Sequence, residues 1–143
     1  MKRIYSKKDP NKLLHIINRM SEINLRTNVS PEDQFIQLAT MKLDAGKTFS
    51  PHKHIWRSAS HDYIIAQESW VVIQGKVRVH LYDIDDTHLG DEIIERGDCS
   101  ITYEGGHTYT ILENNTTIYE YKTGPYNGQE YDKEFIRDHR DLN

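Results

Sequence analysis

Two histidines separated by one residue, His52 and His54, are the side chains of this sequence best placed for chemistry. In an extended strand, alternate side chains project from the same face of the sheet, so both imidazoles can point toward one position. Glu68 and His107 follow on later segments that would form other strands of a closed sheet. Imidazole nitrogens and a carboxylate oxygen are suitable ligands for Zn, Fe, Mn or Ni. The sequence therefore predicts a divalent transition-metal site of three histidines and one glutamate.

Glycines flank this set at regular distances. Five residues separate Gly46 from His52, and six separate Glu68 from Gly75. This spacing resembles the first motif of the cupin superfamily, in which a glycine, His-x-His, a glutamate and a second glycine follow one another. The resemblance implies a jelly-roll barrel with a bound metal, and it implies no settled reaction.

One segment departs from that motif. The stretch between His54 and Glu68 is about ten residues longer than the motif allows. We interpret residues 55–67 as carrying an insertion that forms a loop over the mouth of the barrel. His61 and Gln67 therefore stay open as alternatives to Glu68 at the metal.

A second stretch of the chain resembles the second cupin motif. Gly97 begins it, and Gly105-Gly106-His107 carries its histidine one position early. Tyr103 stands where that motif has proline, and the motif's asparagine is missing. The first motif is the more specific of the two.

Two further segments, Arg26-Thr27-Asn28 and residues 120–126, resemble the small WbuC-type cupin metalloproteins. Those proteins are associated with surface-polysaccharide gene clusters. The resemblance therefore implies a carbohydrate or sugar derivative as ligand, in the context of polysaccharide biosynthesis.

The remaining pattern predicts an all-β fold after one short helix. Asp9-Pro10 is a favourable cap and first-turn pair, and Leu13, Leu14, Ile17 and Met20 follow at helical spacing. From residue 35 onward, short segments of alternating polarity are separated by Gly, Asn and Asp turns, which favours a sandwich or barrel. The predicted strands are 35–41, 69–73, 77–82, 93–94, 99–103, 107–112 and 117–121.

These elements predict a single-domain cupin jelly-roll β-barrel over residues 31–126. An N-terminal helix and arm over 1–30 precede it, and a charged C-terminal tail over 127–143 follows it. At 143 residues the chain is long enough for one core and too short for two ordinary domains.

Composition excludes several classes of partner. The formal net charge is −4 and the acidic residues are scattered, so no footprint for nucleic acid is visible. No apolar run approaches the roughly 18 residues of a membrane helix, and no hydrophobic region follows the basic N-terminus. The single cysteine, Cys99, cannot form an internal disulfide, which suits a reducing compartment. We expect a cytoplasmic protein that binds a small molecule and neither nucleic acid nor membrane.

Several aromatic residues and one arginine are candidates for contact with that small molecule. Aromatic faces hold sugar rings through apolar C–H contacts, and nearby polar groups bind the hydroxyls. The alternative, which we favour for most of the aromatic residues, is a place in the core or at a dimer interface; the arginine would then be a solvated charge at the rim. The candidate substrate-binding residues are Trp56, Arg57, Trp70, Tyr109 and Tyr119.

For Glu120 and the remaining histidines, the sequence predicts only the kind of environment. Glu120 is either a buried acceptor that fixes the tautomer of a ligand histidine or one half of a cross-strand surface pair. The remaining histidines have no partner at ligand spacing and are expected at the surface; they are His15, His80, His88 and His139.

Three functions stay open. The first is a metal-binding cupin that acts on or binds a carbohydrate or sugar derivative. The second is a metal-free sugar-nucleotide ketoisomerase or epimerase, because members of that cupin branch use barrel histidines such as His52 or His54 as acid–base groups. The third is a non-enzymatic ligand-binding cupin. Cupin barrels commonly pair through strand edges, so the resemblance also implies a homodimer.

Overall fold

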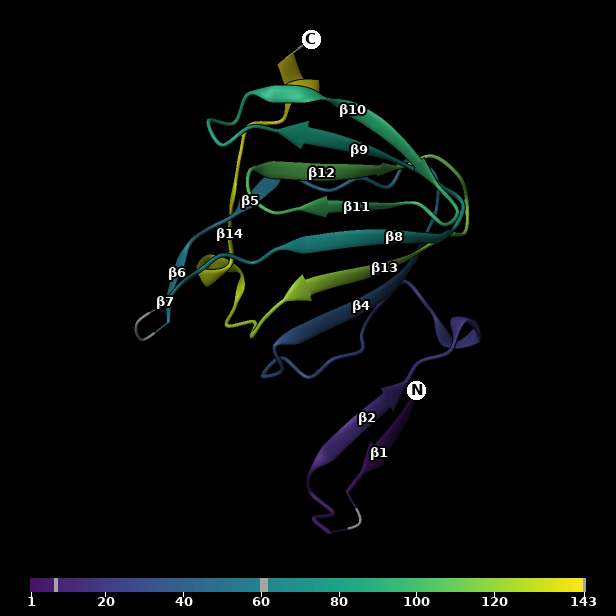
Figure 1. The fold of residues 1–143 in the computed structure, drawn as a ribbon. Helices are drawn as coiled ribbons and strands as arrows, with labels where there is room; N and C mark the ends of the chain where they lie inside the picture. Colours follow the sequence, from purple (N-terminus) through teal and green to yellow (C-terminus); the bar gives the residue numbers. More distant parts are fainter. Residues whose placement is uncertain (7, 60–61, 143) are drawn as a thin grey trace.

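Alternating apolar and polar residues give this chain two antiparallel five-stranded sheets (Figure 1). The computed structural model describes residues 1–6, 8–59 and 62–142, without the side chains of residues 17, 57–59, 62–64 and 142. The first sheet contains, in spatial order, β11 (Cys99–Thr102), β8 (Glu68–Gln74), β13 (Thr116–Thr123), β4 (Ile36–Leu43) and β3 (Arg26–Asn28). The second contains β10 (His88–Glu95), β9 (Lys76–Tyr82), β12 (Gly106–Ile111), β5 (His52–His54) and β14 (Lys133–Phe135).

The hydrophobic core lies between the two sheets. Each sheet contributes alternate residues of its central strands, and the opposite faces of those strands are left for polar side chains. The first sheet contributes Met41, Trp70, Val72 and Ile118, and the second contributes Val77, Val79, Ile94, Tyr109 and Ile111. The all-β architecture predicted from the sequence is confirmed.

The turn between β8 and β9 depends on the glycine that ends the first motif. Gly75 has a φ of +89°, which is unfavourable for residues with a Cβ. A Cβ at this position would lie 2.2 Å from Thr116 Oγ1, so the backbone of β13 packs where a side chain would stand. Glycine is therefore required for the hairpin that begins with Glu68.

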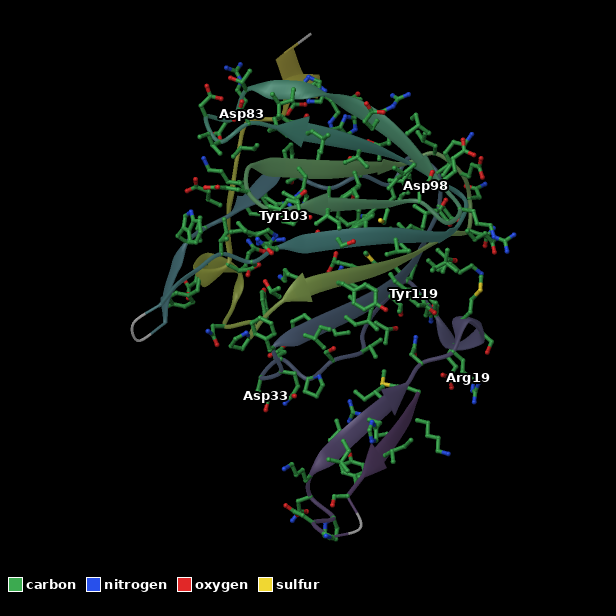
Figure 2. The ribbon with its side chains drawn as sticks, in the orientation of Figure 1. Arg19, Asp33, Asp83, Asp98, Tyr103 and Tyr119 are labelled. Carbon is green, nitrogen blue, oxygen red and sulfur yellow. The ribbon has the colours of Figure 1, made fainter. Side chains whose placement is uncertain are left out.

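The N-terminal helix predicted over residues 9–20 is wrong. Residues 2–17 instead form a two-stranded hairpin of β1 (Lys2–Tyr5) and β2 (Leu13–Ile17), and the 3₁₀ turn η1 (Met20–Glu22) follows. Lys2 pairs with Ile17 and Ile4 with His15, so backbone hydrogen bonds to a distant segment satisfy these residues. The hairpin extends away from the sheets, and its side chains stand apart from the core (Figures 1 and 2).

The segment interpreted as an insertion contains a second small hairpin, β6 (Arg57–Ala59) and β7 (Asp62–Ile64). His61, which was an alternative ligand, lies outside the described residues. The C-terminal segment is ordered against the barrel: η2 (Gln129–Tyr131) leads into β14, which pairs with β5, and η3 (His139–Leu142) follows. None of the helical segments in the described part of the chain is long and apolar enough to span a bilayer.

Candidate metal centre

The structure brings the four predicted metal ligands together inside the barrel. His52 and His54 lie on β5, Glu68 begins β8, and His107 lies on β12, where it pairs directly with His52. Glu68 Oε2 is 3.2 Å from His54 Nε2, and Glu68 Oε1 is 3.2 Å from His107 Nε2. One ligand atom from each of the four buried side chains lies within 4.8 Å of the others. The glutamate, carried by the opposite sheet, therefore closes the set.

Backbone and side-chain acceptors orient two of the histidines. His52 Nδ1 donates to the carbonyl oxygen of Ser50 at 3.1 Å. His54 Nδ1 donates to Asp132, with the backbone oxygen at 3.2 Å and Oδ2 at 3.1 Å. Because each Nδ1 carries the donated proton, each Nε2 is left to face the interior. Histidines that bind metals are commonly held in this way.

His107 provides the test of whether the site fits a metal ion. Its side chain is fully buried, yet neither ring nitrogen has a hydrogen-bond partner of suitable geometry among the described residues. Buried polar atoms without a partner are rare in folded proteins. A cation between His107 Nε2 and the carboxylate of Glu68 would satisfy both groups, and the donor set suits a divalent transition metal. The residues present therefore fit such an ion.

Burial and mutual contact determine the charges of this cluster. Burial, helped by the nearby charges of His107 and Lys133, lowers the pKa of His52 to about 3. Burial opposes the charged form of His54, but hydrogen bonds to Asp132 and Glu68 outweigh it and raise its pKa. Burial alone would raise the pKa of Glu68, yet His107 and His54 hold it well below its ordinary value. The glutamate is therefore ionised, as metal binding requires.

Two residues of the C-terminal segment belong to this site and were missed by the sequence analysis. Lys133 Nζ reaches within 3.3 Å of His52 Nε2, and burial lowers the pKa of this lysine. Asp132 accepts from His54 and also from Lys122, whose Nζ is 2.8 Å from Oδ2. Burial alone would raise the pKa of Asp132, but these contacts lower it to about 2. No local spacing marks either residue, because the pairing of β14 with β5 brings them to the site.

A cavity of about 250 Å³ opens beside the cluster. Trp70 and Tyr109 stack there with ring centroids 3.8 Å apart, and Phe49 meets the edge of Trp70 at 5.6 Å. Burial raises the pKa of Tyr109 well above its ordinary value, so its hydroxyl stays neutral. Polar side chains complete the wall, and they include Arg26, Asn28, Gln37, Glu120, Lys122 and Lys133. The cavity combines an aromatic wall with hydrogen-bonding groups, as small-molecule sites commonly do.

The structure separates the predicted substrate-binding residues. Trp70 and Tyr109 line the cavity, whereas Trp56 is 49% exposed and donates from Nε1 to Glu104 at 3.4 Å. Tyr119 (labelled in Figure 2) alternates on β13 with the cavity-lining residues Glu120 and Lys122, so it faces the other side of the sheet. The side chain of Arg57 lies outside the described residues.

Glu120 does not accept a hydrogen bond from a ligand histidine, as one interpretation of the sequence expected. Its carboxylate accepts from Trp70 Nε1 at 3.1 Å and pairs with Arg26 at 2.7 Å. Asp132 takes the orienting role instead. Glu120 thus holds the aromatic wall of the cavity rather than the metal ligands.

Replacement of Asp132 by asparagine will weaken metal binding at this centre about 10- to 100-fold, the range found when an outer partner of a ligand histidine is removed. The amide keeps the shape of the side chain but loses the charge that orients His54. Zinc titration against a chromophoric chelator measures the change. Exposed Asp33 offers a matched control, Asp33→Asn, with unchanged affinity. Equal affinities in the two variants would contradict the role given to Asp132.

The surface position expected for the other histidines is wrong for His80. This side chain is 3% exposed, and it gathers with His88, Asp91 and His139 into a second cluster of potential ligands. His15 is exposed on β2, as expected. The three clustered histidines come from different strands and turns, so their spacing in the sequence shows no pattern.

Comparison with known proteins identifies the fold. No family model and no curated protein matches the sequence. The capsular polysaccharide assembling protein CapF from Staphylococcus aureus aligns with a TM-score of 0.63 and 14% identity, over 79% of this chain and 32% of CapF. This chain thus spans about a third of CapF.

Two further solved structures align with this chain over most of their own length. An uncharacterized conserved protein with a double-stranded β-helix domain from Klebsiella pneumoniae subsp. pneumoniae aligns with a TM-score of 0.56 and 15% identity, over 85% of this chain and 91% of that one. KdgF from Halomonas sp. aligns with a TM-score of 0.52 and 19% identity, over 68% and 77% of the two chains. This chain has two facing antiparallel sheets. Together with these structural likenesses, that arrangement shows the cupin jelly-roll fold, a double-stranded β-helix.

Proposed function

We propose that this chain is a metal-binding cupin protein that binds or acts on a small carbohydrate or sugar derivative. One observation carries the metal: the buried imidazole of His107 lacks a hydrogen-bond partner among the described residues and faces the carboxylate of Glu68. His52, His54, Glu68 and His107 would hold a divalent transition metal, with Zn, Fe, Mn and Ni all compatible with these ligands. Four protein ligands leave two positions of a six-coordinate ion for a ligand.

The cavity supports a small polar ligand. Its volume of about 250 Å³ is just below the roughly 300 Å³ at which typical drug-sized pockets begin, which fits a single sugar ring. The metal, when bound, supplies a Lewis acid for a carbonyl or hydroxyl oxygen. Lys133 Nζ lies beside the cluster and can donate to an adjacent ligand oxygen, and Arg26 and Gln37 also line the cavity. The neutral hydroxyl of Tyr109 can donate or accept.

The carbohydrate class also draws on structural likeness. CapF is described as a capsular polysaccharide assembling protein, and about a third of it shares the fold of this chain. The resemblance of residues 26–28 and 120–126 to WbuC-type proteins points to the same polysaccharide context. These likenesses support the class of ligand and leave the identity of the sugar to experiment.

Metal analysis and ligand binding test this function together. Protein purified without added metal should contain a transition metal by mass spectrometry. A panel of neutral and acidic monosaccharides should bind, or be converted, only by the metal-loaded protein. Chelation should abolish that binding while circular dichroism shows the barrel still folded. Binding or turnover that persists after complete chelation would contradict a role for the metal.

A metal-free ketoisomerase or epimerase is the second candidate, and one observation favours it. His54 lies between two carboxylates, with hydrogen bonds to Asp132 and Glu68 that need no metal. A histidine held in this way can act as a general acid or base. Protein that contains no metal, turns over a sugar nucleotide in the presence of chelator and loses this activity in His54→Gln would establish this candidate. A ligand that is bound and recovered unchanged would instead indicate a binding protein.

We propose that the chain forms a homodimer through its N-terminal hairpin, and that it resides in the cytoplasm, as the lone Cys99 suits. Ile4, Tyr5 and Leu14 are 36%, 45% and 48% exposed on this hairpin. An isolated two-stranded hairpin is marginally stable in water, so contact with a second copy would stabilise it.

Removal of residues 1–18 tests the dimer. Light scattering should give twice the 16.8 kDa chain mass for the intact protein and a single-chain mass for the truncated one. Among the side chains that the structure describes in residues 1–18, none belongs to the core between the two sheets, so the barrel should stay folded. A monomeric mass for the intact chain would refute the dimer.

A further inference from the structure

A second group of potential metal ligands lies on the opposite face of the sheet that carries the candidate metal centre. His80 lies on β9, His88 and Asp91 on β10, and His139 in η3. Asp91 pairs directly with His80 across the two strands, so their side chains share one face. Val79 packs in the core, and adjacent residues of a strand face opposite sides. His80 therefore points to the outer face, away from the interior cluster.

The three imidazoles converge on one carboxylate oxygen of Asp91. Asp91 Oδ1 is 2.8 Å from His80 Nδ1, 2.8 Å from His88 Nε2 and 3.9 Å from His139 Nε2. One ligand atom from each residue lies within 4.8 Å of all the others. Zinc bonds of about 2.0–2.1 Å in a tetrahedral site place ligand atoms roughly 3.3 Å apart. The observed distances between ligand atoms lie on both sides of that value. Small side-chain movements would therefore bring the four ligand atoms to tetrahedral spacing.

Hydrogen bonds on the far side of two rings prepare them for a metal. His80 Nε2 is 2.9 Å from Thr110 Oγ1, and His139 Nδ1 is 2.6 Å from the hydroxyl of Tyr82. These oxygens can accept from the ring N–H, which leaves His80 Nδ1 and His139 Nε2 as lone pairs that face Asp91. Metal-binding histidines almost always donate their other ring nitrogen to such an acceptor.

The hydroxyl network around His80 makes this arrangement more specific. Thr110 Oγ1 donates to Thr48 Oγ1 at 3.3 Å and accepts from Arg140, and in this arrangement it can also accept from His80 Nε2. His80 Nδ1 lies 2.8 Å from Asp91 Oδ1, and the two atoms form a hydrogen bond when Nδ1 carries the proton. When Nε2 donates to Thr110 instead, the Nδ1 lone pair faces the carboxylate and the two atoms can share a cation.

The surroundings determine how an ion would reach the site and what it would do. His88 and Asp91 are 30% and 33% exposed, whereas His80 is 3% exposed, so one side of the cluster is open to solvent. The ring centroids of His88 and His139 lie 3.6 Å apart in a stack, and the rings must tilt apart to share an ion. His88, which is partly exposed, can do so by rotating its side chain. η3 lies over β10 at the end of the chain (Figure 1), and the stack and Arg140 already hold it there.

We propose that His80, His88, Asp91 and His139 form a second metal site, which takes Zn²⁺ or a similar divalent transition metal and fastens the C-terminal turn η3 to β9 and β10. Four protein ligands around zinc make a closed, structural site. The fastened segment continues back to β14, which carries Lys133 into the interior cavity. The outer ion thereby steadies the strand that completes the inner site.

Zinc stoichiometry tests the proposal independently of the interior centre. The Glu68→Gln variant removes an interior ligand and should still bind one equivalent of Zn²⁺ by equilibrium dialysis and mass spectrometry. Adding His88→Gln and Asp91→Asn to that background should weaken this binding more than ~100-fold, because a lost ligand matters more than a lost outer partner. The wild type should bind two equivalents. The matched control, His15→Gln on the exposed β2, should change nothing.

A second measurement follows the segment itself. In the Glu68→Gln background, Zn²⁺ should slow hydrogen exchange in residues 137–142, and His88→Gln should remove that effect. Cobalt in place of zinc should give the visible absorption of a tetrahedral nitrogen and oxygen site. No zinc bound by Glu68→Gln, or zinc bound equally well after the changes at His88 and Asp91, would overturn the proposal. A wild-type protein that binds zinc only at the outer cluster would contradict the metal centre of the proposed function and leave this site standing.

Discussion

Glutamine in place of Glu68 will lower the affinity of the interior centre for its metal more than ~100-fold, a cost of about 2.7 kcal/mol or more. The substitution keeps the volume of the side chain but removes the anionic oxygens that lie 3.2 Å from His54 Nε2 and His107 Nε2. The metal would then face three neutral imidazoles in a buried site. Without the carboxylate, nothing balances the charge of the ion there, and burial of an unbalanced charge is costly.

Isothermal titration with Zn²⁺ in a His88→Gln background measures this effect, because the outer cluster then contributes little. The exposed Glu130 offers the control variant Glu130→Gln, which should bind zinc as tightly as its parent. Affinity within threefold of the parent in Glu68→Gln would show that this glutamate is no ligand. In that case residues of the 55–67 segment, such as Gln67, become the candidates for the fourth position.

Trp70→Ala will cost about 3–5 kcal/mol of unfolding free energy, the range for a large aromatic removed from a core. Trp70 is 2% exposed. Its ring stacks on Tyr109 with centroids 3.8 Å apart, and it meets Phe49 edge-on with centroids 5.6 Å apart. Its indole N–H also donates to Glu120, so the change leaves a half-buried carboxylate with one partner fewer. The melting temperature should fall by roughly 10–20 °C in a chain of this size.

The second tryptophan of the chain gives the control. Trp56 is 49% exposed, and Trp56→Ala should change stability by less than about 1 kcal/mol. The loss of stability in Trp70→Phe should lie between those of Trp56→Ala and Trp70→Ala, because phenylalanine keeps an aromatic ring beside Tyr109 but removes the donor to Glu120. Urea unfolding followed by circular dichroism compares all three. Similar losses for Trp56→Ala and Trp70→Ala would show that the aromatic stack does not hold the core.

Residue spacing along single strands was enough to predict much of this protein. Val77 and Val79 alternate with polar neighbours, and the structure places both in the core of β9. The resemblance of two segments to the cupin motifs also predicts which four side chains form the interior cluster. For the pair His52 and His54, as for Val77 and Val79, a strand sends alternate side chains to one face, so the local sequence alone states which residues share it.

Local spacing failed where a distant segment decided the structure. Leu13, Leu14, Ile17 and Met20 fit a helical period, but hydrogen bonds to β1 make residues 13–17 a strand. An apolar pattern this short fits either a helix or a strand, and the presence of a partner strand decides between them. The same limit applies to Tyr119, because local spacing cannot tell which face of a sheet borders a cavity.

The tertiary structure alone assembled the remaining parts of both sites. Asp132 and Lys133 reach the interior because β14 pairs with β5 across a long stretch of chain. His80 and His139 meet because the last turn of the chain folds back over β9 and β10. Short-range periodicity determined which side chains each strand presents inward. The register between strands distant in sequence decided which side chains meet, because backbone pairing depends on the whole packed barrel.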